Sequence, residues 1–275
     1  MAEAPGARPQ VAPPRRRSTA SWQRVRPALV SIVSVGLVLL GWQAAGTWGP
    51  AHRGIGATPA EVLRAGLGLL ASGELLAHAL VSLQELALGF VLAVLVGVPL
   101  GLAMGRVPRL GHLLDPLVMT GHATPRIALL PVLVLWLGIG VASKAALAFL
   151  GAVFPVLVNT LAGVRQLDPL WERAVRAFGG RSVTVLAKVV LPGTLPAVMG
   201  GLRLGLGRAL IGVIVGEMYV SVAGVGQLLA VYGNAGRTGE LLALAGLVGL
   251  VSLAGVQACR AAEARLGPWR RGPAP

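Results

Sequence analysis

Residues 168–192 read DPLWERAVRAFGGRSVTVLAKVVLP and form the longest polar interruption between two strongly apolar segments of the chain. Asp168 predicts a helix N-cap, because its side chain can accept a hydrogen bond from a free backbone N–H of the first turn. Pro169 suits the first helical position, where its missing N–H does no harm. Gly179 and Gly180 predict the end of this helix, since glycine adopts the left-handed conformation at little cost.

Two short helices are therefore predicted in this segment, and the first of them is amphipathic. Its apolar stripe contains Leu170, Trp171, Ala174, Val175 and Phe178, and its charged side contains Glu172, Arg173 and Arg176. The second helix is expected to begin at Ser182, a possible cap, and to end at Pro192. A compact amphipathic unit between two membrane spans predicts a docking surface on one side of a bilayer.

The composition of the whole chain is that of a membrane protein. Of its 275 residues, 55% are hydrophobic and only 12% are charged, and its 39 glycines suit helices that pack closely in lipid. The single cysteine, Cys259, excludes a disulfide framework and a metal cluster held by thiolates. The net charge of +14 is concentrated in the tails and in alternate loops, which favours orientation in a membrane over nucleic-acid binding.

Long apolar runs predict an all-α polytopic fold with about six transmembrane helices. The expected spans are residues 28–46, 86–105, 127–142, 145–164, 195–220 and 241–258. Residues 111–124 are expected to form a helix that leads into the third span, with a break near Pro125 and Arg126. The second span carries a predicted close-packing face of glycines spaced four residues apart, Gly97, Gly101 and Gly105.

Polar residues near the ends of the spans are interpreted as surface features. Residues 58–61, Thr-Pro-Ala-Glu, form a capping box that predicts a surface or interfacial helix. His52 and His78 are expected on the surface. Residues 84–85, Gln-Glu, are expected at an interfacial polar edge, and residues 143–144, Ser-Lys, in a tight turn outside the membrane.

The distribution of lysine and arginine predicts that both termini lie in the cytoplasm. Assigning alternate loops to opposite sides of the membrane places seventeen basic residues inside and four outside. Basic residues accumulate on the cytoplasmic side of membrane proteins. The imbalance therefore supports an even number of spans with residues 168–192 on the inside.

Residues 168–192 resemble the cytoplasmic "EAA" loop of ABC-importer permeases. That loop has a Glu-Ala-Ala segment, a glycine and an apolar-x-Leu-Pro ending; the matching residues here are Ala174, Gly179, Val189, Leu191 and Pro192. Arg173 stands at the position of the family's glutamate. The nearest acid is Glu172, one residue earlier, which turns the charge by about 100° round the helix.

The segments that flank this loop narrow the resemblance to permeases of the nitrate, sulfonate and taurine type. They read ALLPVLVLWLGIG at 128–140, FPVLVNTLAGV at 154–164 and LPGTLPAVMGGLRLGLGRALIGVIVGEM at 191–218. The resemblance covers roughly residues 58–266. Residues 1–26 are rich in Pro, Ala and Arg, which predicts a disordered basic cytoplasmic tail, and residues 27–266 are expected to form a transmembrane permease domain. The core of that domain lies at about 78–260, the coupling loop at 168–192, and a cytoplasmic tail at 267–275.

The resemblance implies a multi-pass subunit of the bacterial inner membrane and no enzymatic activity. Such a subunit forms the path for a small anionic or zwitterionic solute, such as an aliphatic sulfonate, taurine or nitrate. Its implied partners are ABC ATPase subunits, which bind the ATP, an extracytoplasmic solute-binding protein and a second copy of the chain. The chain itself is expected to hold no cofactor or metal. The implied ATPase-coupling residues are Asp168, Trp171, Glu172, Arg173, Ala174, Arg176, Phe178 and Gly179.

Charged residues inside the spans cost about 2.5–3.5 kcal/mol each at the bilayer centre and therefore need a reason. Arg203, Arg208 and Glu217 share the fifth span. One interpretation places Arg208 and Glu217, with Asn159 of the fourth span, along the translocation path. The alternative has both arginines near the cytoplasmic end, reaching the interface, and Glu217 bonded to a neighbouring helix near the outer end.

Other function classes lack their motifs. Neither Lys144 nor Lys188 follows a glycine, so the chain has no Walker A motif. Gly205-x-Gly207 lies inside an apolar span and is interpreted as a packing feature. An intramembrane serine protease is excluded because no histidine follows His122 to act as a late general base. The alternative that stays open is a self-contained secondary transporter or channel, although the sequence shows no internal repeat.

Overall fold

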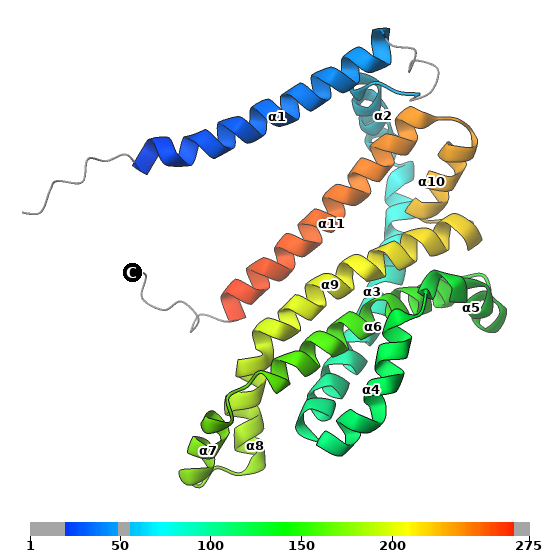
Figure 1. Ribbon diagram of the computed structural model, residues 1–275. Coiled ribbons are helices and arrows are strands. Elements are labelled where there is room, and N and C mark those ends of the chain that lie inside the picture. Colours follow the sequence, from blue (N-terminus) through cyan, green and yellow to red (C-terminus); the bar gives the residue numbers. More distant parts are fainter. Residues whose placement is uncertain (1–19, 49–55, 267–275) are drawn as a thin grey trace, which may run out of the picture. The chain divides into compact units, whose positions relative to one another are not determined.

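The computed structural model describes residues 20–48 and 56–266, and these residues form helices and connecting turns without a strand (Figure 1). The all-α prediction is therefore confirmed for the described residues. The chain divides into two compact units, residues 1–59 and 60–275. Most of the expected N-terminal tail, the whole of the C-terminal tail and His52 lie outside the described residues.

The first unit contains one helix, α1 (Ala20–Trp48), in its described part. This helix covers the predicted span at 28–46 and begins earlier, so it includes residues 20–26 of the expected tail. Its stretch Val33–Thr47 is apolar, and most of the valines and leucines there are exposed. A helix that is apolar on all sides suits a lipid environment.

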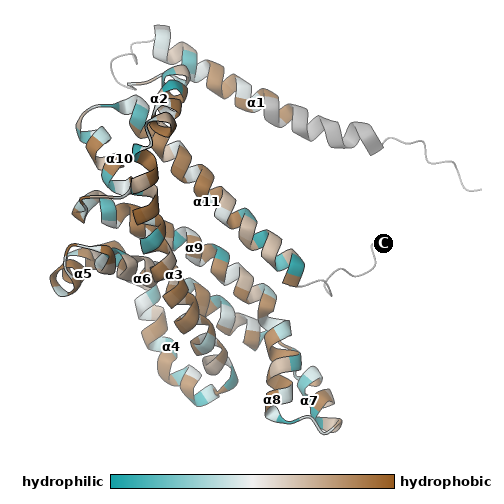
Figure 2. Cartoon of the chain, turned by 180° about the vertical axis from the view of Figure 1, so that it is seen from behind, coloured by the Kyte–Doolittle hydropathy of each residue, from teal (hydrophilic) through white to brown (hydrophobic). Residues whose placement is uncertain are grey.

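The second unit contains the remaining helices. Its first half comprises α2 (Pro59–Ser72), α3 (Glu74–Arg106), α4 (Pro108–Ala123), the short η2 (Arg126–Leu129), α5 (Leu130–Leu137) and α6 (Val141–Arg165). Its second half comprises α7 (Pro169–Ala177), α8 (Ser182–Val185), the π turn η3 (Leu186–Val190), α9 (Leu191–Val220), α10 (Val225–Asn234) and α11 (Thr238–Leu266). Apolar residues dominate α3 and α5 (Figure 2).

Within the described residues, 4 helices are long and apolar enough to cross a membrane: α3, α6, the continuous α8–α9 and α11. A fifth candidate is the pair of α4 with η2–α5, which is bent by 90°. The break predicted near Pro125 is confirmed, because Pro125 is the N-cap of η2. The second span is longer than predicted, since α3 already begins at Glu74.

Helix α6 is the centre of the second unit and packs against α3 on one side and α9 on the other. In the most apolar 18-residue stretch of α6, 67% is buried, compared with 11% in the corresponding stretch of α11. The predicted glycine face of α3 makes the first of these contacts. A Cβ on Gly101 would lie 2.7 Å from the Leu157 carbonyl oxygen, and one on Gly97 would lie 3.0 Å from that of Val153. Only glycine permits this approach of the two backbones.

Two of the predicted surface features are wrong. Glu85 is fully buried on α3, and Lys144 is buried on α6 rather than placed in an outside turn. Lys144 Nζ lies 2.8 Å from Glu85 Oε1 and donates a hydrogen bond of 2.7 Å to the Ser221 hydroxyl. Each charge is tolerated inside the unit because the other one compensates it.

A second polar cluster joins α3 to the start of α10. The Glu217 carboxylate accepts hydrogen bonds from the Ser82 hydroxyl at 2.6 Å and from the Gly226 N–H at 2.7 Å. Ser82 in turn accepts from the Val225 N–H at 2.9 Å, so both side chains satisfy free N–H groups of the first turn of α10. His78, predicted as a plain surface residue, is half-buried and hydrogen-bonds with the Gly224 backbone at 3.0 Å.

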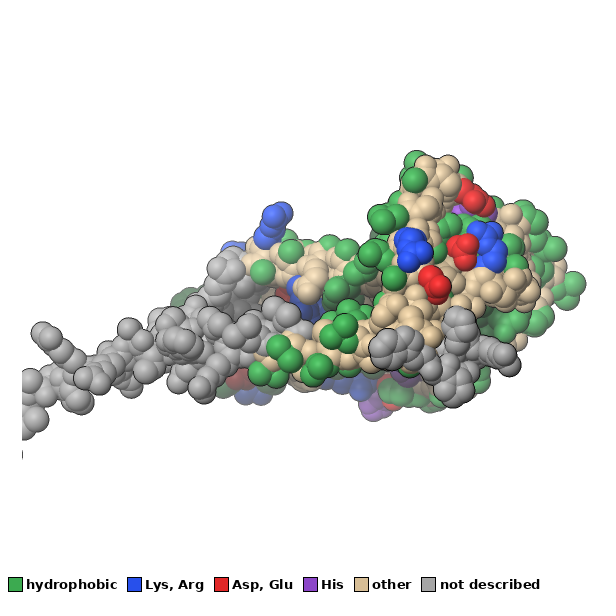
Figure 3. Space-filling view, turned by 90° about the horizontal axis from the view of Figure 1, so that it is seen from above, with side chains coloured by type: hydrophobic (Ala, Val, Ile, Leu, Met, Phe, Trp, Pro, Cys, Tyr) green, Lys and Arg blue, Asp and Glu red, His purple; other side chains and the backbone are tan. Residues whose placement is uncertain are grey.

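The turn between α10 and α11 carries a small charged cluster. Arg237 Nη2 lies 2.8 Å from Glu240 Oε1, and the guanidinium lies 4.7 Å above the ring of Tyr232. Figure 3 shows acidic and basic side chains gathered at this end of the second unit. The loop with α7 and α8 lies at the opposite end (Figure 1).

The second helix of the 168–192 segment differs from its prediction. Pro192 does not end it, because α8, the π turn and α9 form one continuous helix from Ser182 to Val220. A wide turn of this kind can accommodate a helical proline by shifting the backbone hydrogen bonds around it. Ser182 is not the cap either; the N-cap is Arg181, without a side-chain hydrogen bond.

Candidate functional site

Local hydrogen bonds fix the shape of the loop at residues 168–192. The Asp168 side chain accepts a hydrogen bond of 2.8 Å from the Leu170 N–H, which confirms the predicted N-cap. At the other end Gly179 has φ +80°, the left-handed conformation predicted for it. The N–H of Gly180 then donates to the Val175 carbonyl at 2.9 Å, closing α7 with a Schellman motif.

The predicted apolar stripe of α7 divides into an inward and an outward part. Val175 packs against a buried cluster that contains Val185 and Val190, which holds the loop to the base of α6 and α9. Phe178 is 93% exposed and Trp171 is 56% exposed. Large apolar side chains on a rigid, capped helix that remain this exposed indicate a contact surface.

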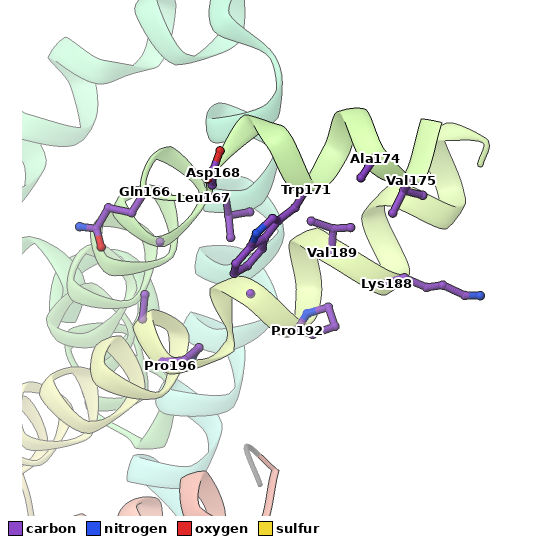
Figure 4. A pocket seen from close by; sticks show the side chains of 13 residues that line it. Gln166, Leu167, Asp168, Trp171, Ala174, Val175, Lys188, Val189, Pro192 and Pro196 are labelled. Atoms are coloured by element: carbon purple, nitrogen blue, oxygen red, sulfur yellow. The ribbon is translucent and has the colours of Figure 1, made fainter. Parts of the chain in front are cut away.

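A pocket of about 860 Å³ separates α7 from the start of α9. Trp171 points from α7 across this pocket, and Lys188 extends away from it (Figure 4). The Trp171 ring reaches the α9 backbone, since a Cβ on Gly193 would lie 3.9 Å from its edge. The two arms of the loop are therefore in contact at its base.

One ion pair ties the loop to a neighbouring helix, and a second one joins α6 to α4 just before the loop begins. Glu172 pairs with Arg106 at the end of α3, and Arg165 Nη2 lies 3.6 Å from Asp115 Oδ1 on α4. Arg173, which stands at the position of the family's glutamate, is exposed, as is Arg176. The acid nearest to the family's position is thus engaged within this chain.

The residues predicted for the translocation path lie in different surroundings. Arg208 lines a cavity of about 350 Å³ together with His122 and Arg126 at the break between α4 and α5. Glu217 lies in the buried cluster with Ser82, as in the second of the two roles considered for it. The Asn159 amide donates a hydrogen bond of 2.8 Å to the Pro155 carbonyl of its own helix.

The sequence did not identify the partners of Arg203 and Arg126. Arg203 Nη2 lies 2.6 Å from Glu263 Oε2 on α11, so it forms an ion pair between helices rather than reaching the interface alone. Arg126 enters the cavity from the bend itself. An arginine directly after a proline in an apolar run was visible in the sequence, but only the fold shows that it meets Arg208.

Comparison with known proteins assigns the family. The family described as "Binding-protein-dependent transport system inner membrane component" matches residues 89–266 of this chain. The taurine transport system permease protein TauC of Escherichia coli is 31% identical, over 92% of this chain and 94% of its own. The protein of Bacillus subtilis named aliphatic sulfonates transport permease protein SsuC is 33% identical, over 74% of this chain and 73% of its own.

A third relative agrees with these two. The aliphatic sulfonates transport protein SsuC of Escherichia coli is 35% identical, over 70% of this chain and 73% of its own. The family match includes every membrane-crossing candidate from most of α3 to α11, and it includes the loop at 168–192. The chain therefore belongs to the binding-protein-dependent transport system inner membrane components, as a multi-pass inner-membrane permease of the sulfonate and taurine type.

Proposed function

We propose that this chain forms the translocation path of an ATP-driven importer for a small anionic or zwitterionic solute, such as an aliphatic sulfonate, taurine or nitrate. A separate ATPase binds the ATP, and an extracytoplasmic binding protein delivers the solute. The observation that carries the proposal is the loop at 168–192. It presents Trp171 and Phe178 to solvent at the end of a helix that continues into the membrane.

The loop has the properties of a docking surface for a soluble partner. Burying one large apolar side chain contributes about 1.5–3 kcal/mol, so Trp171 and Phe178 together can supply several kcal/mol of binding. Most of the exposed charges around them are basic, from Arg173, Arg176 and Arg181, and Asp168 is the exposed acid. A groove on the ATPase with an apolar floor and an acidic rim complements this surface.

The continuous helix Ser182–Val220 supplies the mechanical connection. Its 39 residues extend over about 60 Å, twice the hydrocarbon thickness of about 30 Å. The helix therefore projects beyond the lipid and carries the loop with it. When two ATPase subunits close on ATP, rigid-body movement of the loop tilts α9 and changes which side of the membrane the path faces.

The wider arrangement follows from the same proposal. Six spans, with α1 as the first and the bent α4–α5 pair as the third, place both termini in the cytoplasm with the loop. A second copy of the chain completes the path, because the apolar faces of α5 and α11 are extensively exposed in one copy. Asp168, Ala174 and Gly179 shape the coupling surface. Asn159 stays a predicted residue of the path, whereas Glu217 takes the alternative role of bonding α9 to α3 and α10.

The experiment that tests this function uses Gly179→Val. A β-branched residue is strained at the φ of +80° that Gly179 adopts, so the end of α7 and Phe178 should move. We expect normal membrane insertion but ATP hydrolysis without solute uptake in proteoliposomes that contain the whole transporter. Gly236→Val is the matched control, because Gly236 has φ +67° in an open turn at the opposite end.

Two outcomes would contradict the proposal. If the Gly179→Val transporter couples ATP hydrolysis to uptake as well as the control does, the loop has no role in coupling. Concentrative uptake by vesicles that contain this chain alone, driven by solute or an ion gradient, would identify a self-contained transporter instead.

A further inference from the structure

We infer that the cavity at the break between α4 and α5 binds the anionic group of the transported solute. The inference rests on the proposed function and adds to it a site within the permease itself. The ligand class is a small oxyanion, such as a sulfonate, a carboxylate or nitrate. The residues that would hold it are Arg126 and Arg208.

Three elements build the cavity. The break contributes His122, Thr124 and Arg126, α6 contributes Gly151, and α9 contributes Arg208 and Gly212. Its volume of about 350 Å³ lies at the small end of the range of about 300–1,000 Å³ for ligand sites. A small solute fits this space, and a large one does not.

The charges that line the cavity all have one sign. Arg126 and Arg208 interact electrostatically with each other, and both act on His122. The cavity lining contains no aspartate or glutamate, and no carboxylate in the described part of the chain forms an ion pair with either guanidinium. Paired cations among membrane-crossing helices are costly, and a bound anion offsets that cost.

Arg126 is held in place but has an unused donor. Its Nη2 donates a hydrogen bond of 2.7 Å to the His122 carbonyl, and its guanidinium carbon lies 5.7 Å from the ring centroid of Phe154. Its Nε is buried and has no hydrogen-bond partner among the described residues. A buried donor without a partner is rare in folded proteins and points to a missing acceptor. A planar guanidinium suits the paired oxygens of a sulfonate or carboxylate.

Close helix packing fixes the position of Arg208, the second arginine of the cavity. A Cβ on Gly151 would lie 2.8 Å from the Arg208 carbonyl oxygen, so the backbones of α6 and α9 are in direct contact at this point. Arg208 is 12 residues before the end of α9, which places it about 18 Å from that end and within the thickness of a bilayer. Glu217 is held away from the cavity by Ser82 and Gly226, so this acid does not neutralise the site.

Binding of ethanesulfonate tests the site directly. The permease with its ATPase subunits is placed in nanodiscs of phosphatidylcholine, without the binding protein, and titrated by calorimetry. We expect Arg126→Gln and Arg208→Gln each to weaken binding by about tenfold or more, since a charge-assisted hydrogen bond is lost. Arg208→Lys keeps the charge and should retain part of the affinity. The control is Arg203→Gln, on the same helix but paired with Glu263, and should bind within about twofold of the unaltered protein.

The outcomes separate this site from the coupling function. The inference is overturned if both glutamine variants bind within about twofold of the unaltered protein. It is also overturned if the unaltered protein binds none of ethanesulfonate, taurine and nitrate. The proposed coupling is unaffected by either result, because Gly179→Val tests it. A lipid phosphate could also occupy the cavity, and nanodiscs containing phosphatidylglycerol test this. If ethanesulfonate no longer binds in these nanodiscs and the arginine variants still take up solute normally, the occupant is a lipid phosphate and the inference is overturned.

Discussion

Glu85 and Lys144 form the ion pair that joins α3 to α6 inside the second unit, with both side chains buried. Removing one partner of a buried pair leaves an uncompensated charge and costs about 3–5 kcal/mol. We expect Glu85→Leu to lower the free energy of unfolding by this amount. Denaturation of the purified protein in mixed micelles measures the change.

A second substitution provides the control for this prediction. Lys144→Met in the Glu85→Leu background removes the remaining charge, and apolar replacement of a buried pair is often neutral or stabilising. The double variant should therefore recover most of the lost stability. Equal stability of the single variant and the unaltered protein would show that the pair contributes nothing to folding.

At the residue scale, local chemistry was predictable from the sequence and distant partners were not. The roles of Asp168 and Gly179 depend on neighbours within the same helix, and both predictions are confirmed. Glu85 and Lys144 are far apart in the chain and looked like surface charges. Only the packing of α3 against α6 shows that they neutralise each other.

The contact between α3 and α6 belongs to the scale of the elements. We expect Gly101→Val to separate these helices, because its Cβ would already lie 2.7 Å from the Leu157 carbonyl oxygen. Overpacking of this kind costs about 1–3 kcal/mol. The control is Gly246→Val on α11, where a Cβ would meet nothing within 4 Å. Thermal denaturation of the two variants in detergent makes the comparison, and similar midpoints would contradict the prediction.

The sequence predicted which elements exist better than where they end. Hydropathy located α3, α6, α9 and α11, because lipid requires a continuous apolar segment. The span predicted at 127–142 is wrong as a single helix, because α5 ends at Leu137 and crosses only together with the bent α4. Hydropathy placed the start of α3 at residue 86, since the polar residues before it suggested an interface. Ser82 and Glu85 are buried against other helices instead, and α3 begins at Glu74. The π turn before Pro192 was also missed, because the proline predicts a helix end unless the surrounding turn adapts.

At the scale of the whole molecule, the pair of Arg106 with Glu172 links the loop to α3. Both side chains are about one-quarter exposed, so the pair contributes little to stability, about 0–1 kcal/mol. Its expected role is to keep the loop aligned. We expect Glu172→Arg to leave thermal stability nearly unchanged while lowering the solute transported per ATP hydrolysed.

Reversing the charges of both Arg106 and Glu172 tests whether the ion pair itself aligns the loop. The Arg106→Glu and Glu172→Arg double variant restores an ion pair of opposite polarity and should recover coupling in proteoliposomes. If the double variant stays as uncoupled as the single one, Glu172 acts through direct contact with the ATPase and the alignment role is wrong.

The sequence predicted the family, and the comparisons confirm it from the same residues. The loop and its flanks are continuous segments, so their pattern is visible without a structure. The cationic cavity is different, because His122, Arg126 and Arg208 come from separate elements. Its assembly depends on the 90° bend between α4 and α5, which no local pattern specifies.

The π turn at Leu186–Val190 has a consequence for engineering. Such a turn holds one residue more than an α-helical turn, so deleting a single residue there would convert it to regular helix. That change would leave the direction of α7 nearly the same, because the π turn already absorbs the extra residue, whereas a deletion in the regular part of α9 would turn α7 by about 100° and point Phe178 in a new direction. The number of residues in the regular helix that follows the π turn therefore sets the direction in which the loop points. A chimera that exchanges loops between transporters must preserve this count to engage the same motor.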